Sequence, residues 1–176
     1  MKFTLPSFAL SLIFTINVFA QNPSKPLAVG DAIPTFKLKD QDGKPFSVAT
    51  EIGKKILIIY FYPKDESMVC TKEACAFRDS FADYTKEGAQ IIGINGGTVE
   101  SHKKFSEHYK LPFILLSDPD NKVLKMFGVK NKFFMTGRQT FVVDLKGKIA
   151  FSYESMLEGT AHSKQALAVV KSLKKK

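Results

Sequence analysis

Apolar runs alternate with amphipathic segments along the chain, and this order predicts strands and helices in turn. The runs at residues 54–62 (KKILIIYFY), 89–95 (AQIIGIN) and 112–117 (PFILLS) do not alternate between polar and apolar positions. Such uninterrupted runs are typical of strands that are covered on both faces. We therefore predict three central strands, the first of them ended by Pro63.

Helical periodicity fills the segments between and after these strands. The predicted ranges are residues 70–87, 99–109, 118–128 and 161–174. Gly88 is a natural stop for the first helix, and Thr98 is a candidate cap for the second. The expected buried stripe of the first helix consists of Ala74, Phe77, Phe81 and Tyr84.

Two hairpins complete the pattern. Residues 35–39 and 45–48 flank the turn cluster DQDG, and residues 138–144 and 148–153 flank LKG. Strands that alternate with helices, with an N-terminal β-hairpin and a terminal hairpin and helix, predict an α/β sandwich around a mixed sheet.

The first twenty residues do not fit this pattern and are interpreted as a signal peptide. Lys2 precedes a short uncharged apolar run, and VFA ends at Ala20 with small residues at alternate positions. We expect cleavage near Ala20, export to a bacterial periplasm and no stable membrane association afterwards, with an uncleaved anchor as the alternative. A linker at 21–26 and one domain at 27–176 follow.

Composition and charge narrow the range of functions. A hydrophobic content of 44% is enough for a core without disulfides. The net charge is +9, but Arg78 and Arg138 are the two arginines among many scattered lysines. Arginine is the preferred reader of bases and phosphates, so we expect no nucleic-acid partner. The lysines of KSLKKK at the end fit a solvated helix terminus.

The two cysteines, Cys70 and Cys75, carry the candidate chemistry. A metal site is disfavoured because zinc normally takes four ligands and no second cysteine pair exists. The histidines His102, His108 and His162 lie far from the cysteines in sequence, and we expect surface or satisfied core roles for them. We predict no metal and no other cofactor.

A structural disulfide between the two cysteines conflicts with the predicted helix. A continuous helix separates them by roughly 7.5 Å along its axis and about 140° around it. The bond would therefore require local unwinding, and its short loop would give little stability. The other interpretation is a reactive thiol at the helix start, where unpaired N–H groups stabilise a thiolate, with a second thiol to resolve its sulfenic acid. The spacing alone leaves both open.

The residues around the pair resemble the peroxiredoxin active site. In FYPKDESMVCTKEAC, a proline precedes a serine by four positions and a cysteine by seven; these are Pro63, Ser67 and Cys70. The second cysteine, Cys75, resembles that of the Q-type group, also called bacterioferritin-comigratory proteins, and Arg138 in GRQTFVVDLKGKI resembles its distal arginine. The resemblance covers about residues 27–173 and implies a thioredoxin-like three-layer fold.

The resemblance also implies a reaction. Cys70 would be the peroxidatic nucleophile toward hydrogen peroxide and small organic hydroperoxides, and Arg138 would stabilise its thiolate and polarise the O–O bond. Cys75 would resolve the sulfenic acid as an intramolecular disulfide, which a thioredoxin-like protein would reduce. A resolving cysteine within the chain predicts a monomer.

Supporting roles follow from the same resemblance. Ser67 would hydrogen-bond the peroxide, Pro63 would shield the thiolate from water, and the backbone N–H groups of Val69 and Cys70 would hold the peroxide oxygens. Met68 and Val69 stand where the family usually has Pro-Gly, which changes the freedom of the loop backbone.

The same residues allow alternatives to a peroxidase. A disulfide reductase would need two cysteines separated by two residues rather than four. Without the motif, Arg138 would fit a surface ion pair, for example with Asp144, and Ser67 a helix cap. A non-enzymatic redox sensor or holdase would share the reactive Cys70.

Overall fold

A single mixed sheet forms the centre of the molecule in the computed structural model, which describes residues 26–132 and 135–173. The predicted signal peptide lies outside the described residues. The strands are β1 (Lys37–Asp40), β2 (Pro45–Ser47), β3 (Ile56–Phe61), β4 (Ala89–Asn95), β5 (Ile114–Ser117), β6 (Gln139–Val143) and β7 (Ile149–Glu154). Their order in the sheet is β2-β1-β5-β4-β3-β6-β7.

The sheet is mixed because parallel central strands meet antiparallel hairpins. β3, β4 and β5 are parallel, with Ile59 of β3 opposite Ile92 of β4. β6 runs antiparallel to β3 and forms a hairpin with β7, and β1 pairs antiparallel with β2 and with β5. The predicted strands and both hairpins are thus confirmed.

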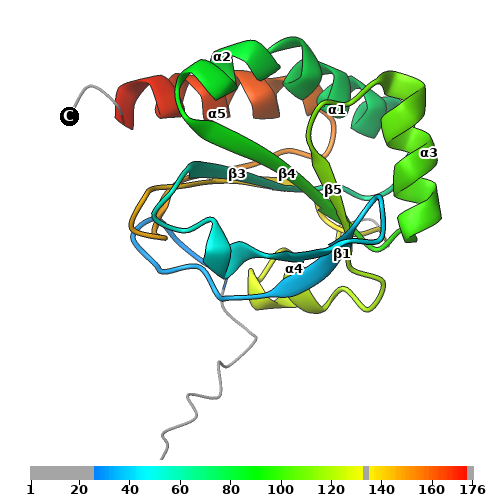
Figure 1. Cartoon of the computed structure of the whole chain (residues 1–176), viewed down its shortest axis with the longest axis horizontal. Coiled ribbons are helices and arrows are strands. Elements are labelled where there is room, and N and C mark those ends of the chain that lie inside the picture. Colours follow the sequence, from blue (N-terminus) through cyan, green and yellow to red (C-terminus); the bar gives the residue numbers. More distant parts are fainter. Residues whose placement is uncertain (1–25, 133–134, 174–176) are drawn as a thin grey trace, which may run out of the picture.

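Helices cover the two faces of the sheet. They are α1 (Met68–Asp79), α2 (Phe81–Lys86), α3 (Val99–Tyr109), α4 (Lys122–Met126) and α5 (Gly159–Leu173), with a 3₁₀ turn, η1 (Val48–Thr50). Figure 1 shows α1, α2 and α5 on one side and α4 on the other. The expected three-layer α/β sandwich is therefore confirmed.

The side chains of β3 connect the layers. All six residues of the strand are buried, and successive side chains point to opposite faces. Ile58 and Tyr60 belong to the core under α1, α2 and α5, whereas Leu57, Ile59 and Phe61 belong to the core on the α4 side. This double burial explains why the sequence run shows no alternation.

The first predicted helix differs from the structure. Instead of one helix over 70–87, α1 begins at Met68 and a break at Ser80 separates it from α2. Ser80 has φ −98° and ψ 5°, outside helical values, although its N–H still bonds the Ala76 carbonyl. Serine favours such helix ends because it is a weak helix former. The stripe survives the break: Tyr84 is buried and its hydroxyl donates to the Ser163 carbonyl of α5.

The remaining helices lie where they were predicted, but α4 covers only residues 122–126 of the predicted 118–128. The Thr98 side chain accepts a hydrogen bond from the Ser101 N–H, so the predicted cap of α3 is confirmed. At α4, the Asp118 carboxylate accepts from the N–H groups of Lys122 and Leu124. α5 begins at Gly159, two residues earlier than predicted. Among the helices of the described residues, none is long and apolar enough to cross a membrane.

Candidate active site

The start of α1 places Cys70 in its first turn. Ser67 occupies the N-cap position, yet its side chain makes no cap hydrogen bond; its hydroxyl lies 3.2 Å from the Lys64 carbonyl instead. The N–H groups of Val69 and Cys70 lie in the first turn, where no intrahelical acceptor exists. Helix geometry thus aims uncompensated N–H dipoles at the region of the Cys70 thiol, and these favour a thiolate.

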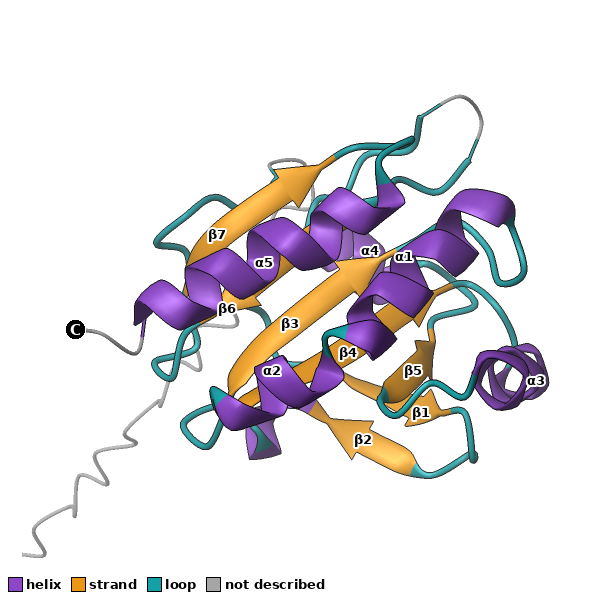
Figure 2. Cartoon of the chain, turned by 90° about the horizontal axis from the view of Figure 1, so that it is seen from above, coloured by secondary structure: helices purple, strands orange, loops and turns teal. Residues whose placement is uncertain are grey.

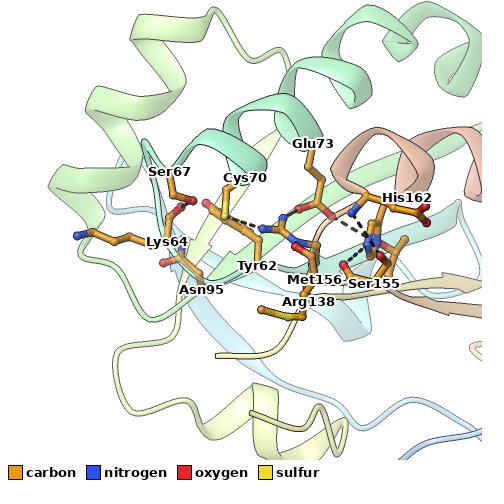
Figure 3. Close-up of polar contacts among 12 residues, drawn as sticks. Tyr62, Lys64, Ser67, Cys70, Glu73, Asn95, Arg138, Ser155, Met156 and His162 are labelled. Atoms are coloured by element: carbon orange, nitrogen blue, oxygen red, sulfur yellow. Dashed lines mark hydrogen bonds and ion pairs between the residues drawn. The ribbon is translucent and has the colours of Figure 1, made fainter. Parts of the chain in front are cut away.

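Arg138 reaches this thiol from the neighbouring strand. It directly precedes β6, whose Gln139 pairs with Phe61 at the end of β3, where the chain turns toward α1. Its Nη2 lies 3.0 Å from Cys70 Sγ, its Nη1 pairs with the Glu73 carboxylate, and its Nε donates to the Met156 carbonyl over 3.2 Å. Figure 3 shows the guanidinium between the sulfur and the carboxylate.

The alternative role of Arg138 as a surface partner of Asp144 is wrong. Arg138 is only 2% exposed, and Asp144 instead accepts hydrogen bonds from the N–H groups of Lys146 and Lys148 in the turn of the second hairpin. Burial on its own would lower the pKa of Arg138, but the adjacent Glu73 and Cys70 raise it above its usual value. The guanidinium is therefore a permanent cation beside the thiol.

Glu73 is a site residue that the sequence reasoning missed. It is fully buried in α1, one turn after Cys70 and one turn before Phe77. A signal was present, because a glutamate stood within the apolar stripe of a predicted helix. Burial raises the pKa of Glu73 to about 8, although the neighbouring Arg138 cation acts in the opposite direction.

His162 extends the same polar cluster into α5. Its ring is fully buried; Nδ1 lies 2.8 Å from Thr140 Oγ1 and 3.4 Å from Glu73 Oε1, and Nε2 lies 2.9 Å from the Ser155 carbonyl. Burial lowers the pKa of His162 to about 4, against the effect of that carbonyl. The expectation of a core role for this histidine is confirmed, but its partners place it beside the site.

Close packing of α1 and α5 holds this cluster together. Figure 2 shows the two helices side by side over the sheet. A Cβ on Gly159 would lie 2.6 Å from the Val69 carbonyl oxygen and 3.2 Å from the Glu73 backbone nitrogen. Glycine is therefore required at the first residue of α5 so that it can approach the turn that carries Cys70.

The loop before α1 is fixed by a buried carboxylate, Asp65. Its oxygens accept from Tyr62 Oη at 2.8 Å, Asn95 Nδ2 at 3.0 Å and Ser101 Oγ at 2.6 Å, and lie 2.8 Å from His102 Nδ1. Burial on its own would raise the pKa of Asp65, but the hydrogen bonds from His102, Ser101 and Tyr62 outweigh it and lower that pKa. The loop is thereby tied to β4 and α3.

We expect Asp65→Asn to destabilise the fold by about 3 kcal/mol, because an amide cannot accept from all of these buried donors. Urea denaturation measures the loss. Since the folded-state pKa of Asp65 is lowered, its contribution is present above about pH 4 and is lost as the pH falls further. The difference in the free energy of unfolding between wild type and Asp65→Asn should become smaller in acid. A difference that does not change with pH would contradict this account. Asp83→Asn, at an exposed ion pair with Lys171, is the control.

The two cysteines are separate in the reduced structure. Cys70 is buried, Cys75 is half-buried, and both are free thiols. α1 runs through both positions without interruption, so the condition under which a disulfide requires unwinding is met.

The other predicted site residues lie around this centre. Pro63 lines a cavity of about 460 Å³ together with Lys64, Asn95 and Thr136. His108 is exposed and pairs with Glu66, and His102 pairs with Asp65. Among the described residues, no three His, Cys, Asp or Glu side chains are grouped to hold a metal ion. Cys70 and Arg138 are thus in contact, whereas the roles of Ser67 and Pro63 stay predictions.

Comparison with known proteins decides the family. Residues 29–152 match the AhpC/TSA family. The chain belongs to this family. It is 47% identical over 146 residues to a chloroplastic peroxiredoxin Q of Triticum aestivum, covering 82% of this chain and 67% of that protein. The corresponding protein of Sedum lineare is 46% identical over 147 residues, 82% of this chain and 78% of that one.

Solved structures agree with the peroxiredoxin assignment. Peroxidoxin BcpB from Mycobacterium tuberculosis has a TM-score of 0.78 at 32% identity and covers 84% of this chain and 98% of its own. Xanthomonas campestris peroxiredoxin Q has a TM-score of 0.73 at 28% identity, and the match covers 78% of this chain and 90% of that one. The chain is therefore a thiol peroxidase of the peroxiredoxin Q group with a thioredoxin-like fold. These similarities favour an enzyme over a non-enzymatic sensor or holdase.

Proposed function

We propose that the protein reduces hydrogen peroxide and small organic hydroperoxides with Cys70 as the peroxidatic nucleophile. The observation that carries the proposal is the 3.0 Å contact of Arg138 Nη2 with Cys70 Sγ, in the first turn of a helix. A buried permanent cation and the helix N-terminus both favour the anionic form of the sulfur. The thiolate is the form of cysteine that attacks.

The chemical step needs only the thiolate and the peroxide. A sulfur electron pair attacks the terminal peroxide oxygen, an S–O bond forms and the O–O bond breaks. The departing oxygen takes a proton and leaves as water or an alcohol, while Cys70 becomes a sulfenic acid. Arg138 would stabilise the charge that develops on the two oxygens, and the first-turn N–H groups of Val69 and Cys70 would orient them. Ser67 would reach the peroxide if its hydroxyl leaves the Lys64 carbonyl.

Cys75 is proposed as the resolving residue. Its thiol would attack the Cys70 sulfenic sulfur, forming the S–S bond and releasing water. The first turns of α1 must unwind for this, which breaks the contacts of Arg138 with Cys70 and Glu73. A thioredoxin-like dithiol would then reduce the disulfide. Resolution within one chain supports a monomer, which sedimentation of the reduced and oxidised protein tests.

We expect Cys75→Ser to consume one equivalent of peroxide and then stop. Cys70 would remain as a sulfenic acid, because serine cannot form the disulfide. A sulfenic-acid reagent and intact mass measure the product, and steady-state assays with thioredoxin and its reductase measure the lost turnover. Sustained turnover at the wild-type rate, with the same reductant, would show that Cys75 does not resolve Cys70.

The N-terminal segment is proposed as a targeting peptide that directs export to a bacterial periplasm. The support is its charge and apolar pattern; the curated relatives above are named as chloroplastic. N-terminal sequencing of the expressed protein tests the proposal: a start at Gln21 agrees with it, and an intact Met1 contradicts cleavage.

A further inference from the structure

Glu73 faces His162 on the side away from Arg138. Its Oε2 pairs with Arg138, and its Oε1 lies 3.4 Å from His162 Nδ1 (Figure 3). Oε1 is buried and accepts no hydrogen bond from the described residues. A buried ionised carboxylate normally has both oxygens satisfied. The lack of a donor to Oε1 therefore indicates that Glu73 is not an ordinary ionised carboxylate.

The second ring nitrogen of His162 limits the choices. Nε2 lies 2.9 Å from the Ser155 carbonyl, which can only accept, so Nε2 carries a hydrogen. A neutral ring then has its lone pair on Nδ1, which accepts from the Thr140 hydroxyl at 2.8 Å and therefore has no hydrogen to offer Glu73 Oε1 at 3.4 Å. A lone pair opposite an ionised carboxylate oxygen is repulsive. A proton on Oε1 removes this repulsion.

The charges of the cluster favour that extra proton. Cys70, Glu73 and Arg138 are each at most 2% exposed. A thiolate and a carboxylate would place two buried anions against one guanidinium, and an uncompensated buried charge is costly. A proton on the Glu73–His162 pair balances the charges while the thiolate is present.

The other titratable groups around the pair do not replace this proton. Tyr60 of β3 lies near Glu73, and burial together with Glu73 raises its pKa, so it is neutral. The Tyr153 ring of β7 packs against the His162 ring at 4.8 Å, and its hydroxyl donates to Glu158, an anion. These neighbours from β7 and the start of α5 add no cation to the cluster.

Burial also decides which partner holds the proton. It raises the pKa of Glu73 to about 8 and lowers that of His162 to about 4. Both shifts follow from the cost of a buried charge, since the charged form is the deprotonated acid but the protonated ring. Near neutral pH the proton therefore belongs to Glu73.

We propose that Glu73 in the reduced protein is a neutral carboxylic acid with its proton on Oε1, the oxygen that faces His162 Nδ1, which leaves the charge of Arg138 to Cys70. His162 is then a positioning residue: it acts on the sulfur through Glu73 and Arg138. An ionised Glu73 would compete with the thiolate for the same guanidinium. The consequence for peroxide reduction rests on the proposed role of Cys70, but the protonation state is measurable without peroxide.

Infrared difference spectroscopy of the reduced protein against Glu73→Gln tests the protonation state directly. We expect the carbonyl stretch of a protonated carboxylic acid at pH 7, absent from the variant and lost from wild type in alkaline solution. A carboxylate band at pH 7 in its place would overturn the proposal, whatever the peroxidase activity is.

The pH dependence of Cys70 alkylation by iodoacetamide, in a Cys75→Ser background, tests the positioning role. His162→Phe puts a larger apolar ring in this place and removes the Nδ1 lone pair that opposes a charge on Oε1, so Glu73 ionises more readily and the alkylation midpoint should rise by about one pH unit. In Glu73→Gln this effect of His162→Phe should vanish, because the neutral amide cannot ionise. His108→Phe, at an exposed histidine–glutamate pair, is the matched control.

The two backgrounds separate positioning from packing. A loss of packing would move the midpoint equally in the protein that keeps Glu73 and in the Glu73→Gln variant, and equal shifts would contradict the coupling. If His162→Phe does not fold, the infrared comparison still decides the proposal. A wild-type protein without peroxidase activity, but with the expected infrared and alkylation results, would instead count against the role of Cys70.

Discussion

Cys70→Ser should abolish peroxide turnover, with the steady-state rate falling by more than about 10³-fold. A serine hydroxyl in this site is not ionised near neutral pH and cannot form a sulfenic acid. The measurement is peroxide consumption by residues 21–176 with thioredoxin and its reductase.

Cys75→Ser is the control for this variant, since it removes the other thiol from the same helix. It should keep the first, stoichiometric reaction with peroxide, whereas Cys70→Ser should lose it. If Cys70→Ser consumes peroxide as fast as wild type, the pair returns to being a local disulfide site without a catalytic role.

Arg138→Ala should slow the reaction of the reduced protein with peroxide by about 10²–10³-fold. The variant removes the cation 3.0 Å from Cys70 Sγ and leaves Glu73 without its buried partner. Each buried group that loses its hydrogen bond to Arg138 also costs about 1–3 kcal/mol of stability, so unfolding by urea should be measured beside stopped-flow kinetics. An unchanged rate in a folded Arg138→Ala protein would exclude the arginine from the chemistry.

The second arginine supplies the matched control. Arg78 lies in the same helix as Cys70, but it bonds Asp79 and the Tyr109 carbonyl on the surface between α1 and α3. Arg78→Ala should therefore leave the peroxide rate within about twofold of wild type, since exposed ion pairs contribute little. Arg138→Lys separates charge from geometry: a point charge cannot hold Cys70, Glu73 and the Met156 carbonyl at once, so it should recover only part of the rate.

The fold could be predicted from the sequence because its central strands are uninterrupted apolar runs, which few other structures would explain. The bounds of β4 and α3 are those predicted, since an uninterrupted apolar run and a capped amphipathic segment each favour one structure. The break at Ser80 was not predictable from periodicity, because the buried stripe continues from Phe77 to Tyr84 across it. The break is apparent only in the structure, where α1 and α2 are separate helices that both contact α5.

The site was predictable only where a motif marked it. Arg138 lies 68 positions from Cys70, and its contact depends on β6 pairing with β3, which local pattern cannot give. Glu73 could have been suspected as a buried charge, whereas His162 required the packing of α5 on α1 to be known. Contacts between site residues from distant segments could therefore be predicted only once the topology of the fold was known.

The replacement of the usual Pro-Gly by Met68 and Val69 is accommodated at the helix start. Met68 is 74% exposed, so its side chain adds no volume to the site, and Val69 is half-buried with its carbonyl against Gly159. α1 still begins before Cys70, so the first-turn N–H groups are kept. The groups proposed to hold the peroxide are backbone at these positions, which is why the substitution is compatible with catalysis.

The central claim, that Cys70 attacks peroxide and Cys75 of the same chain resolves it, is tested most directly by peptide mass mapping. The reduced protein would receive one equivalent of hydrogen peroxide, and remaining thiols would be alkylated before digestion. The account predicts a disulfide between Cys70 and Cys75 within a monomer, with no alkylation at Cys70. A Cys70 that stays fully alkylatable after the peroxide is consumed, or a disulfide that joins two chains, would contradict it.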